Sequence, residues 1–256
     1  MKVVILAGGL GSRLSEETSL KPKPLVEIGE QPMLWHIMKI YAAHGFKDFV
    51  LCLGYKGDMI KRYFLDYHER ASDLTVDLAT NTVSPHSGPA EDWRVTLVDT
   101  GVGTQTGGRL KRIARYLDDE PFCMTYGDAV TDLDINSVVE LRRRAGTLAA
   151  VTAVRPLGRF GAIRFDGHTV TGFDEKPAGD GQWINGGFFV LSPTVLDYIR
   201  GDDTVWEQEP MARLTQARQI SVHHHTGFWH CMDTLRDKKE LETLWATPRP
   251  PWRKWE

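Results

Sequence analysis

The sequence predicts an α/β protein with a doubly wound, mostly parallel but mixed sheet, and three observations support this prediction. Short apolar runs typical of buried strands alternate with segments whose apolar residues recur at helical spacing. The first run leads into a glycine-rich loop, as in Rossmann-like sheets whose ligand crevice lies at the carboxyl ends of the strands. From residue 149 onward the expected strands are shorter and separated by turns, which indicates an appended antiparallel or mixed portion.

Up to residue 145 the expected elements alternate regularly. The segment 32–43 has apolar residues at helical spacing and is followed by His44-Gly45, a typical glycine stop. The polar stretch 80–92 contains Pro and Gly and is expected to be an exposed excursion. In chain order we expect strand 3–7, helix 32–43, strand 49–53, helix 59–67, strands 74–78 and 95–98, helix 107–117, strand 122–126 and helix 135–145.

The second part of the chain is expected to mix short strands with helices. In chain order these are strands 149–154, 162–165, 170–175 and 187–191, helices 193–199 and 207–216, strand 220–224, a strand-like run 228–232 and helix 234–245. A group of tryptophans is expected to bury a C-terminal segment rather than to stack on nucleic-acid bases. This group is Trp206, Trp229, Trp245, Trp252 and Trp255.

Length and composition limit the possible classes of protein. A chain of 256 residues, 41% hydrophobic and 25% charged, without a linker rich in Pro or Ser, fits a single domain 1–256. The net charge of −3, with dispersed basic residues, gives no footprint for nucleic acid. No apolar run is long enough to span a bilayer, and the N-terminal run lacks a signal-peptide cleavage pattern. Three cysteines at wide spacings, including Cys52 and Cys123 in apolar runs, favour the reducing cytoplasm.

The segment 3–24 carries the densest chemical signal. Gly8, Gly9 and Gly11 allow close approach of the backbone to a ligand, and successive N–H groups can face one anionic phosphate chain. No Gly-Lys-Ser/Thr closes the loop, and Leu14 stands where a dinucleotide fingerprint has its third glycine, so P-loop and Rossmann dehydrogenase motifs are both disfavoured. Lys23, between two prolines, is held in an extended segment. A tight turn without a ligand remains an alternative for the glycines alone.

Two isolated acids follow predicted strands. Asp128 comes after strand 122–126, which places it at the same sheet edge as the glycine-rich loop, where an acid can hold a cation. Asp233 follows the strand-like run 228–232. Each also fits a structural role, because Asp128 can cap a turn and Asp233 can cap the last helix.

The run Leu-Ala-Gly-Gly-Leu-Gly-Ser-Arg-Leu, followed by Lys-Pro-Lys-Pro-Leu-Val, resembles the signature of the sugar-1-phosphate nucleotidylyltransferases. The resemblance runs along nearly the whole chain and is strongest to the cytidylyltransferase branch of that family. Supporting segments are 23–29, 34–38, 54–57, 98–101, 106–112, 158–162, 206–210, 232–238 and 251–252. The pattern departs from the family at Ser12 and Ala129, and 80–92 matches poorly.

This resemblance implies transfer of a nucleotidyl group from CTP to glucose 1-phosphate, with Arg13 and Lys23 as catalytic residues. It implies that Asp128 and Asp233 hold Mg²⁺, an ion that usually takes one or two protein carboxylates together with waters and phosphates. It also implies that the half 1–147 mainly binds the nucleotide. The implied nucleotide-binding residues are Leu6, Ala7, Gly8, Gly9, Leu10, Gly11, Ser12, Arg13, Thr104, Arg109 and Gly127.

The half 148–256, with the C-terminal helix, is implied to form most of the sugar site. Glu175-Lys176-Pro177 and Asn185-Gly186-Gly187 match two elements that line the sugar pocket in the family, so Glu175, Lys176, Asn185 and Gly186 join Lys23 as candidates for contact with the sugar phosphate. A carboxylate and an amide suit sugar hydroxyls, and an ammonium suits the phosphate. A turn and a strand bulge are the structural alternatives.

The family resemblance also implies a homo-oligomer, without giving its size. Two functional alternatives stay open. One is the same reaction with UTP, dTTP or GTP, or with another phosphorylated acceptor. The other is a catalytically silent sensor of nucleotide sugars. The presence of Arg13, Lys23, Asp128 and Asp233 together disfavours a sensor, which has no need for both leaving-group and metal contacts.

Overall fold

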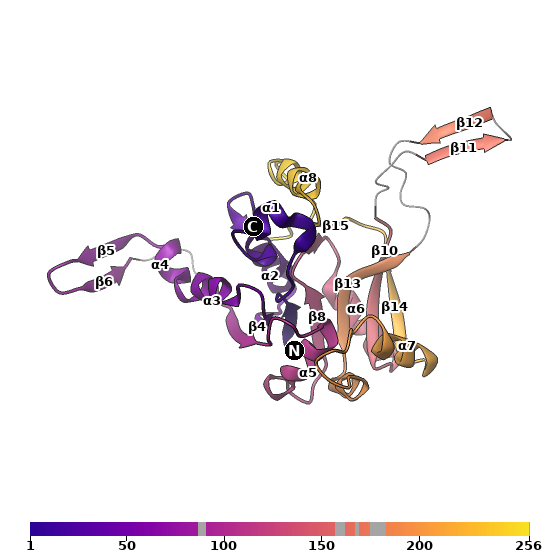
Figure 1. The fold of residues 1–256 in the computed structure, drawn as a ribbon, viewed down its shortest axis with the longest axis horizontal. Coiled ribbons are helices and arrows are strands. Elements are labelled where there is room, and N and C mark those ends of the chain that lie inside the picture. Colours follow the sequence, from indigo (N-terminus) through magenta and orange to yellow (C-terminus); the bar gives the residue numbers. More distant parts are fainter. Residues whose placement is uncertain (87–90, 157–161, 167–168, 175–182, 256) are drawn as a thin grey trace.

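The computed structural model describes residues 1–86, 91–156, 162–166, 169–174 and 183–255. Its centre is a seven-stranded sheet (Figure 1). In spatial order its strands are β14 (Ile220–His225), β10 (Ala149–Val154), β13 (Ile184–Leu191), β8 (Phe122–Tyr126), β1 (Val3–Leu6), β4 (Asp48–Leu53) and β7 (Arg94–Asp99). Strand β13 pairs antiparallel with both neighbours, and the other pairs in this sheet are parallel. The predicted mostly parallel, mixed sheet is therefore confirmed.

Both faces of the sheet are buried because successive residues of a strand point to opposite sides. Val3 and Ile5 of β1 belong to one hydrophobic cluster, whereas Val4 and Leu6 belong to a second. Buried side chains of α2 (Met33–Ala43), α6 (Ile135–Ala145) and α8 (Leu235–Trp245) pack in the first cluster. Those of α5 (Thr106–Arg112) and α7 (Glu209–Gln216) pack in the second. Two covered faces explain why the central strands are apolar without alternation.

Short elements connect these layers. Strand β9 (Ala129–Thr131) pairs antiparallel with β15 (Trp229–Cys231), which links the end of β8 to the segment before α8. The pairing of β9 was not predicted, because it is three residues long. The remaining short elements are η1 (Ser12–Leu14), α1 (Ser15–Thr18), η2 (Lys23–Leu25), β2 (Glu27–Ile28), β3 (Gln31–Pro32), α3 (Gly57–Leu65), α4 (Tyr67–Ala71), η3 (Ala114–Tyr116) and η4 (Pro193–Tyr198).

Two hairpins extend from the body of the molecule in Figure 1. One pairs β5 (Leu74–Asp77) with β6 (Thr82–Pro85), and the other pairs β11 (Ala162–Asp166) with β12 (Thr169–Asp174). The segment 80–92 was predicted to be an exposed excursion, and its described residues 80–86 are exposed, but they include β6, a strand that was not predicted. Asn81 has a φ of 53°, a left-handed conformation suited to the hairpin turn, and a polar composition concealed the strand that follows.

Several predicted boundaries also shift. The predicted helix 107–117 divides into α5 and η3, and the predicted helix 193–199 is the 3₁₀ segment η4. The predicted helix 207–216 begins at Glu209, next to Pro210 in its first turn, a position where the missing N–H of proline costs nothing. Among the described helices, none has the length and apolar character needed to cross a bilayer.

The C-terminal segment packs against α2 in an aromatic cluster. His36 and Trp252 are both 0% exposed, and the ring centroids of His36 lie 4.6 Å from Trp245 and 5.9 Å from Trp252. His36 Nε2 donates to the Ile28 carbonyl at 2.8 Å, so Nδ1 accepts from Trp252 Nε1 at 3.3 Å. Burial lowers the pKa of His36 to about 4. Trp252 thus buries the C-terminal segment as predicted, whereas Trp206 packs in the cluster on the other face of the sheet.

Candidate active site

A cavity of about 560 Å³ lies at the carboxyl ends of β1 and β8. This is the edge at which ligands bind in open α/β sheets. The glycine-rich loop forms one wall, and residues that follow β8 form another. Its lining residues are Leu6, Ala7, Gly8, Gly9, Gly11, Ser12, Arg13, Lys23, Pro24, Thr104, Gln105, Thr106, Arg109, Tyr126, Gly127, Asp128, Asn185 and Glu207.

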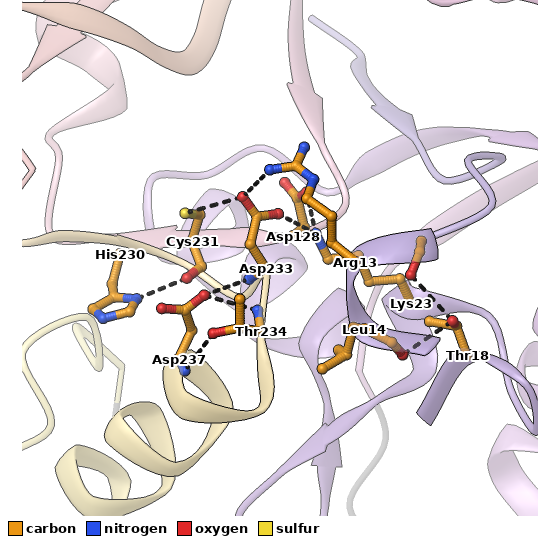
Figure 2. A network of polar contacts seen from close by, with 11 residues as sticks. Arg13, Leu14, Thr18, Lys23, Asp128, His230, Cys231, Asp233, Thr234 and Asp237 are labelled. Carbon is orange, nitrogen blue, oxygen red and sulfur yellow. Dashed lines mark hydrogen bonds and ion pairs between the residues drawn. The ribbon is translucent and has the colours of Figure 1, made fainter. Parts of the chain in front are cut away.

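A chain of ion pairs crosses one side of this cavity (Figure 2). Lys23 Nζ lies 2.8 Å from Asp128 Oδ2 and 2.7 Å from Asp233 Oδ1, and Arg13 Nη1 lies 2.7 Å from Asp233 Oδ2. The Lys23 side chain is 12% exposed and that of Arg13 is 76% exposed. Lys23 is therefore a fixed cation, and Arg13 can reorient toward a ligand.

The electrostatic environment keeps Lys23 charged. Burial by itself lowers the pKa of Lys23, but the carboxylates of Asp128 and Asp233 outweigh this effect and raise that pKa above its ordinary value. The thiol of Cys231 lies 3.9 Å from Asp233 Oδ2, and burial raises the pKa of this thiol to about 12. The cluster thus contains a protonated thiol and an ammonium facing two acids.

Local structure explains how Lys23 is presented. Pro22 is extended, with φ −66° and ψ 147°. Lys23 itself begins the 3₁₀ segment η2, whose first turn contains Pro24 and whose end is closed by the Val26 amide donating to the Lys23 carbonyl at 3.1 Å, so the prediction of an extended Lys23 was wrong. These two prolines fix the backbone on either side of Lys23. The amide N–H of Met232 donates to the Asp128 carbonyl at 2.8 Å, which ties the strand before Asp233 to the strand end that carries Asp128. Segments far apart in the sequence are thereby brought to one point.

The helix cap of α8 explains the orientation of Asp233. Thr234, not Asp233, is the N-cap, and its hydroxyl accepts from the Asp237 amide at 3.2 Å. Asp237 Oδ2 in return accepts from the amides of Asp233 and Thr234 at 3.0 and 2.8 Å. This capping box satisfies the helix end. The carboxylate of Asp233 consequently faces Lys23 and Arg13 instead of capping the helix.

Arg109 organises the base of the glycine-rich loop. Its guanidinium is almost fully buried and donates to the carbonyls of Gly8 and Leu53, both at 3.0 Å, and to the Thr100 hydroxyl at 2.7 Å. A Cβ placed on Gly8 would lie 2.2 Å from Arg109 Nη1, and one on Gly54 would lie 2.6 Å from the same atom. Arg109 therefore fills the space that two glycines leave. Its predicted contact with the nucleotide stays a prediction, since both terminal nitrogens donate to protein acceptors.

A polar group for which no role was predicted also lines the cavity. The Tyr126 hydroxyl donates to Glu207 Oε1, and the Thr106 hydroxyl donates to Glu207 Oε2 at 2.7 Å. Burial, followed by the neighbouring Glu207 charge, raises the pKa of Tyr126. Tyr126 could have been found, because it ends the strand that leads to Asp128. Glu207 lies within the segment 206–210 that matches the family, but nothing in that segment assigned a role to its carboxylate.

Similarity to known proteins identifies the family of the chain that forms this cavity. A family model described as nucleotidyl transferase matches residues 2–234. The chain belongs to the nucleotidyl transferase family. It is 55% identical over 257 residues to glucose-1-phosphate cytidylyltransferase of Salmonella typhi, covering 100% of both chains. It is 42% identical over 256 residues to a Bacillus subtilis protein described as a probable glucose-1-phosphate cytidylyltransferase, again covering 100% of both.

A solved structure supports the same fold for this nucleotidyl transferase. UDP-glucose pyrophosphorylase from Acinetobacter baumanii has a TM-score of 0.72 and 14% identity, covering 98% of this chain and 95% of that chain. At this identity the likeness concerns the fold. The Rossmann-like nucleotidyltransferase fold expected from the sequence is therefore confirmed.

Most of the expected site residues of this nucleotidyl transferase lie together. The predicted nucleotide-binding residues line the cavity except Leu10, whose side chain is 58% exposed. Asn185 lines the cavity, and its Oδ1 accepts from the Gly187 amide at 2.8 Å. A Cβ on Gly186 would lie 2.7 Å from a methyl of Val154, so this glycine allows close packing of β13 on β10. Glu175 and Lys176 lie outside the described residues.

The two aspartates provide a donor set that suits a divalent cation. Asp128 Oδ2 and Asp233 Oδ1 both reach the single ammonium of Lys23, so two hard oxygen ligands already surround one positive charge. Family membership is consistent with a divalent metal at this place. The capping box and the β8–β9 turn hold the two carboxylates from independent elements.

Proposed function

We propose that the protein transfers the cytidylyl group of CTP to α-D-glucose 1-phosphate, producing CDP-glucose and pyrophosphate. The observation that carries this proposal is the convergence of Arg13, Lys23 and Asp233 beside the glycine-rich loop, in a chain with 55% full-length identity to the Salmonella typhi cytidylyltransferase. The convergence supports phosphate chemistry. The identity supports the choice of base and sugar.

In the proposed reaction, a phosphate oxygen of glucose 1-phosphate bonds to the α-phosphorus of CTP. The bond from that phosphorus to the bridging oxygen of the β-phosphate breaks, and pyrophosphate leaves with its electron pair. No general base is required, because a phosphate monoester with a second pKa of about 6 is largely dianionic at neutral pH. The protein has to align two polyanions and offset the charge that develops.

The proposed roles follow from charge and mobility. Arg13 is exposed and has a planar fork that suits bidentate contact with the leaving pyrophosphate. Lys23 is a compact, fixed cation suited to the α-phosphate and the sugar phosphate. The backbone N–H groups of residues 8–12 would hold the triphosphate, with Thr104, Arg109 and Gly127 nearby.

We assign the metal to Mg²⁺, held by Asp128 and Asp233. When bound, it would supply positive charge between phosphate oxygens. The sugar and its phosphate would meet Glu175, Lys176, Asn185 and Gly186, with Lys23 reaching the phosphate from the nucleotide side.

The proposed setting is the cytoplasm, with a homo-oligomer as the working form. Cys52 and Cys123 are free and buried, and burial raises the pKa of each thiol to about 12, which suits a reducing compartment. The substrates are soluble phosphates.

The decisive experiment measures pyrophosphate release with glucose 1-phosphate and each of CTP, UTP, dTTP and GTP, with and without Mg²⁺. Release with CTP and Mg²⁺ is expected. Release only with a triphosphate other than CTP would support nucleotidyl transfer and contradict the assignment of cytosine as the base. Tight nucleotide binding without release above background, for any acceptor sugar phosphate, would favour the silent sensor.

A further inference from the structure

Residues 12–20, here called the Arg13 segment, join the glycine-rich loop to the turn that carries Lys23. Most of these residues are exposed, and Leu14 and Thr18 are the two that are buried, at 0% and 3% exposure. Leu14 packs in the first hydrophobic cluster, and the Thr18 hydroxyl donates to the Leu14 carbonyl at 3.0 Å (Figure 2). A segment with so little buried apolar surface is easily displaced. The position of Arg13 therefore depends on polar contacts between this segment and the rest of the molecule.

One set of contacts fixes the end of α1, within the Arg13 segment. The last carbonyls of a helix lack partners inside the helix. Lys56 Nζ donates to the Thr18 and Ser19 carbonyls at 3.3 and 2.5 Å. The Tyr55 hydroxyl also donates to the Thr18 carbonyl, at 3.2 Å. These contacts hold the end of α1, whereas Arg13 lies before its start.

A second set of contacts joins the Arg13 segment to the start of α8, which lies next to α1 in Figure 1. Arg13 pairs with Asp233, and Lys238 Nζ lies 2.5 Å from Glu17 Oε1. The side chains of Lys238 and Glu17 are 24% and 23% exposed. Salt screens a partly buried pair less than a fully exposed one. Two ion pairs thus connect the segment with α8 and the residue before its cap.

The place of Lys238 in its helix points to a role outside the helix. Lys238 is the fourth residue of α8, and its amide donates to the carbonyl of the N-cap Thr234 at 3.1 Å. The partial positive charge at a helix N-terminus disfavours a cation nearby. The helix dipole therefore does not favour a lysine here, whereas Glu17 provides an acid from another element.

Substrate binding would open one of these two ion pairs. In the proposed function, Arg13 contacts the leaving pyrophosphate and Asp233 holds the metal, so these two side chains separate from each other. Glu17 and Lys238 are not among the described residues that line the active-site cavity, so the substrates do not compete for their ion pair. Of the two ion pairs, the one between Glu17 and Lys238 persists.

We propose that Lys238 is a positioning residue for the nucleotidyl transfer. Through its ion pair with Glu17, it keeps Arg13 beside the leaving pyrophosphate while the pair between Arg13 and Asp233 is open. Lys238 itself touches neither phosphate nor metal. The inference rests on the proposed function, because that function gives Arg13 and Asp233 partners other than each other. It does not depend on which base or sugar the site accepts.

The first test measures amide hydrogen exchange in residues 19–21 of the ligand-free protein. Their amides donate to the Ser15 and Glu17 carbonyls at 3.0 to 3.2 Å, so their exchange reports local opening of α1. Arg13→Ala removes the first ion pair, and Arg13→Ala combined with Lys238→Met removes both. We expect the double variant to exchange at least about threefold faster than Arg13→Ala, a factor that matches the strength of a partly exposed ion pair. Equal rates would overturn the proposal.

Two further variants show whether this effect is specific. Lys39→Met removes an ion pair of similar exposure, because Lys39 Nζ lies 3.0 Å from Glu91 Oε1, with side chains 18% and 21% exposed. In the Arg13→Ala background it should leave exchange in residues 19–21 unchanged. Lys238→Arg keeps the charge and, in that background, should exchange like Arg13→Ala alone. Acceleration by Lys39→Met as large as that by Lys238→Met would reflect general loosening and contradict a specific contact.

The second test measures pyrophosphate release with CTP, glucose 1-phosphate and Mg²⁺. Lys238→Met should lower kcat/KM for CTP by about tenfold, because small displacements of a catalytic group are costly, and Lys238→Arg should retain most of the activity. In the Arg13→Ala background, Lys238→Met should add little, because Lys238 acts through Arg13. Losses that multiply would show that Lys238 acts elsewhere and would overturn the proposal.

The two tests separate this inference from the proposed function. A wild type that releases no pyrophosphate with any triphosphate would contradict the proposed function. The exchange experiment needs no turnover, so it would still decide whether Lys238 holds the Arg13 segment.

Discussion

Residues near the start of the chain meet the C-terminal segment in two places, and these contacts differ in composition. In the active site, Asp233 meets Lys23 and Arg13 through ion pairs at the edge of an open cavity. In the aromatic cluster, Trp252 meets His36 where both residues are 0% exposed. The first contact can exchange its partners for phosphate and metal. The second has no solvent or ligand to exchange with.

This difference separates function from stability. Buried ion pairs contribute little net stability, because desolvation of both charges offsets most of their attraction. Buried rings contribute through apolar area and packing. Substitutions in the aromatic cluster should therefore lower the free energy of unfolding and leave turnover nearly unchanged. Substitutions at Lys23 should lower turnover and change the free energy of unfolding little.

Trp252→Ala should give the largest loss of stability. The indole lies in a ring stack, 5.6 Å from Phe228 and 5.8 Å from Trp245 between centroids, so truncation leaves a cavity and an unpaired His36 nitrogen. We expect about 3–5 kcal/mol lower free energy of unfolding, measured by urea denaturation. Turnover per folded molecule below 20 °C should remain close to wild type. A strong loss of turnover in fully folded Trp252→Ala protein would contradict the expectation that the aromatic cluster supports stability and not turnover.

Lys23→Met should give the largest loss of turnover. It keeps a similar unbranched side chain and removes the charge that two carboxylates share. The expected loss is about 10²–10³ in kcat, the range for removal of one preorganised hydrogen-bond donor. In the absence of metal, Asp128 and Asp233 would repel each other, so added Mg²⁺ should raise the melting temperature of the variant more than that of wild type. Equal responses to Mg²⁺ would argue against a shared metal site.

The aromatic cluster should also make stability depend on pH. The pKa of His36 is about 4 in the folded protein and 6.5 in the unfolded chain, so between these values the unfolded chain binds more protons. Stability from this residue is complete above about pH 6.5 and falls by about 3 kcal/mol as pH drops to 4. Urea denaturation midpoints determined between pH 7.5 and 4.5 measure this loss of stability. His36→Gln should show a flatter dependence over the same range, and identical slopes would rule out His36 as the cause.

Thr234→Ala gives the smallest expected change and links the two regions. Loss of the N-cap should cost about 1 kcal/mol of stability and loosen the backbone of Asp233. Asp134→Ala is the matched control, because Asp134 caps α6, away from the cavity, with a bond of 3.0 Å to the Asn136 amide. Both variants should lose similar stability, and Thr234→Ala alone should lose severalfold in kcat. Equal kcat values would show that the cap does not position Asp233.

The sequence alone could predict the parts of the site that local chemistry specifies. The glycines near Lys23 and the prolines on either side of it have unusual backbone properties, so a cavity lined by the glycine-rich loop, Lys23 and Pro24 could be predicted without a structure. Asp128 was predictable because it follows a clearly apolar strand. The fold class was predictable for a related reason, since β1, β4 and β8 are continuous apolar runs separated by helical periodicity.

Features that depend on long-range packing could not be predicted. The loop that carries Glu207 is held at the cavity by long-range contacts, since Trp206 is buried and its amide donates to the Thr106 hydroxyl, and the family match over 206–210 gave the Glu207 carboxylate no role. The interior position of Arg109 depends on carbonyls from three separate segments, which no local pattern encodes. Strand β6 was missed because exposed strands with Thr and Ser have the composition of a loop.

The pairing of Lys23 with Asp233 has a consequence for synthesis of the chain. The two residues are 210 positions apart, so at about 5–20 residues per second the acid is added roughly 10–40 s after the lysine. For about the first half of that interval neither acid exists, and after Asp128 has been added the growing chain can pair Lys23 with that residue alone. A ribosome that stalls between residues 128 and 233 therefore leaves a fragment with the glycine-rich loop but only one of the two acids.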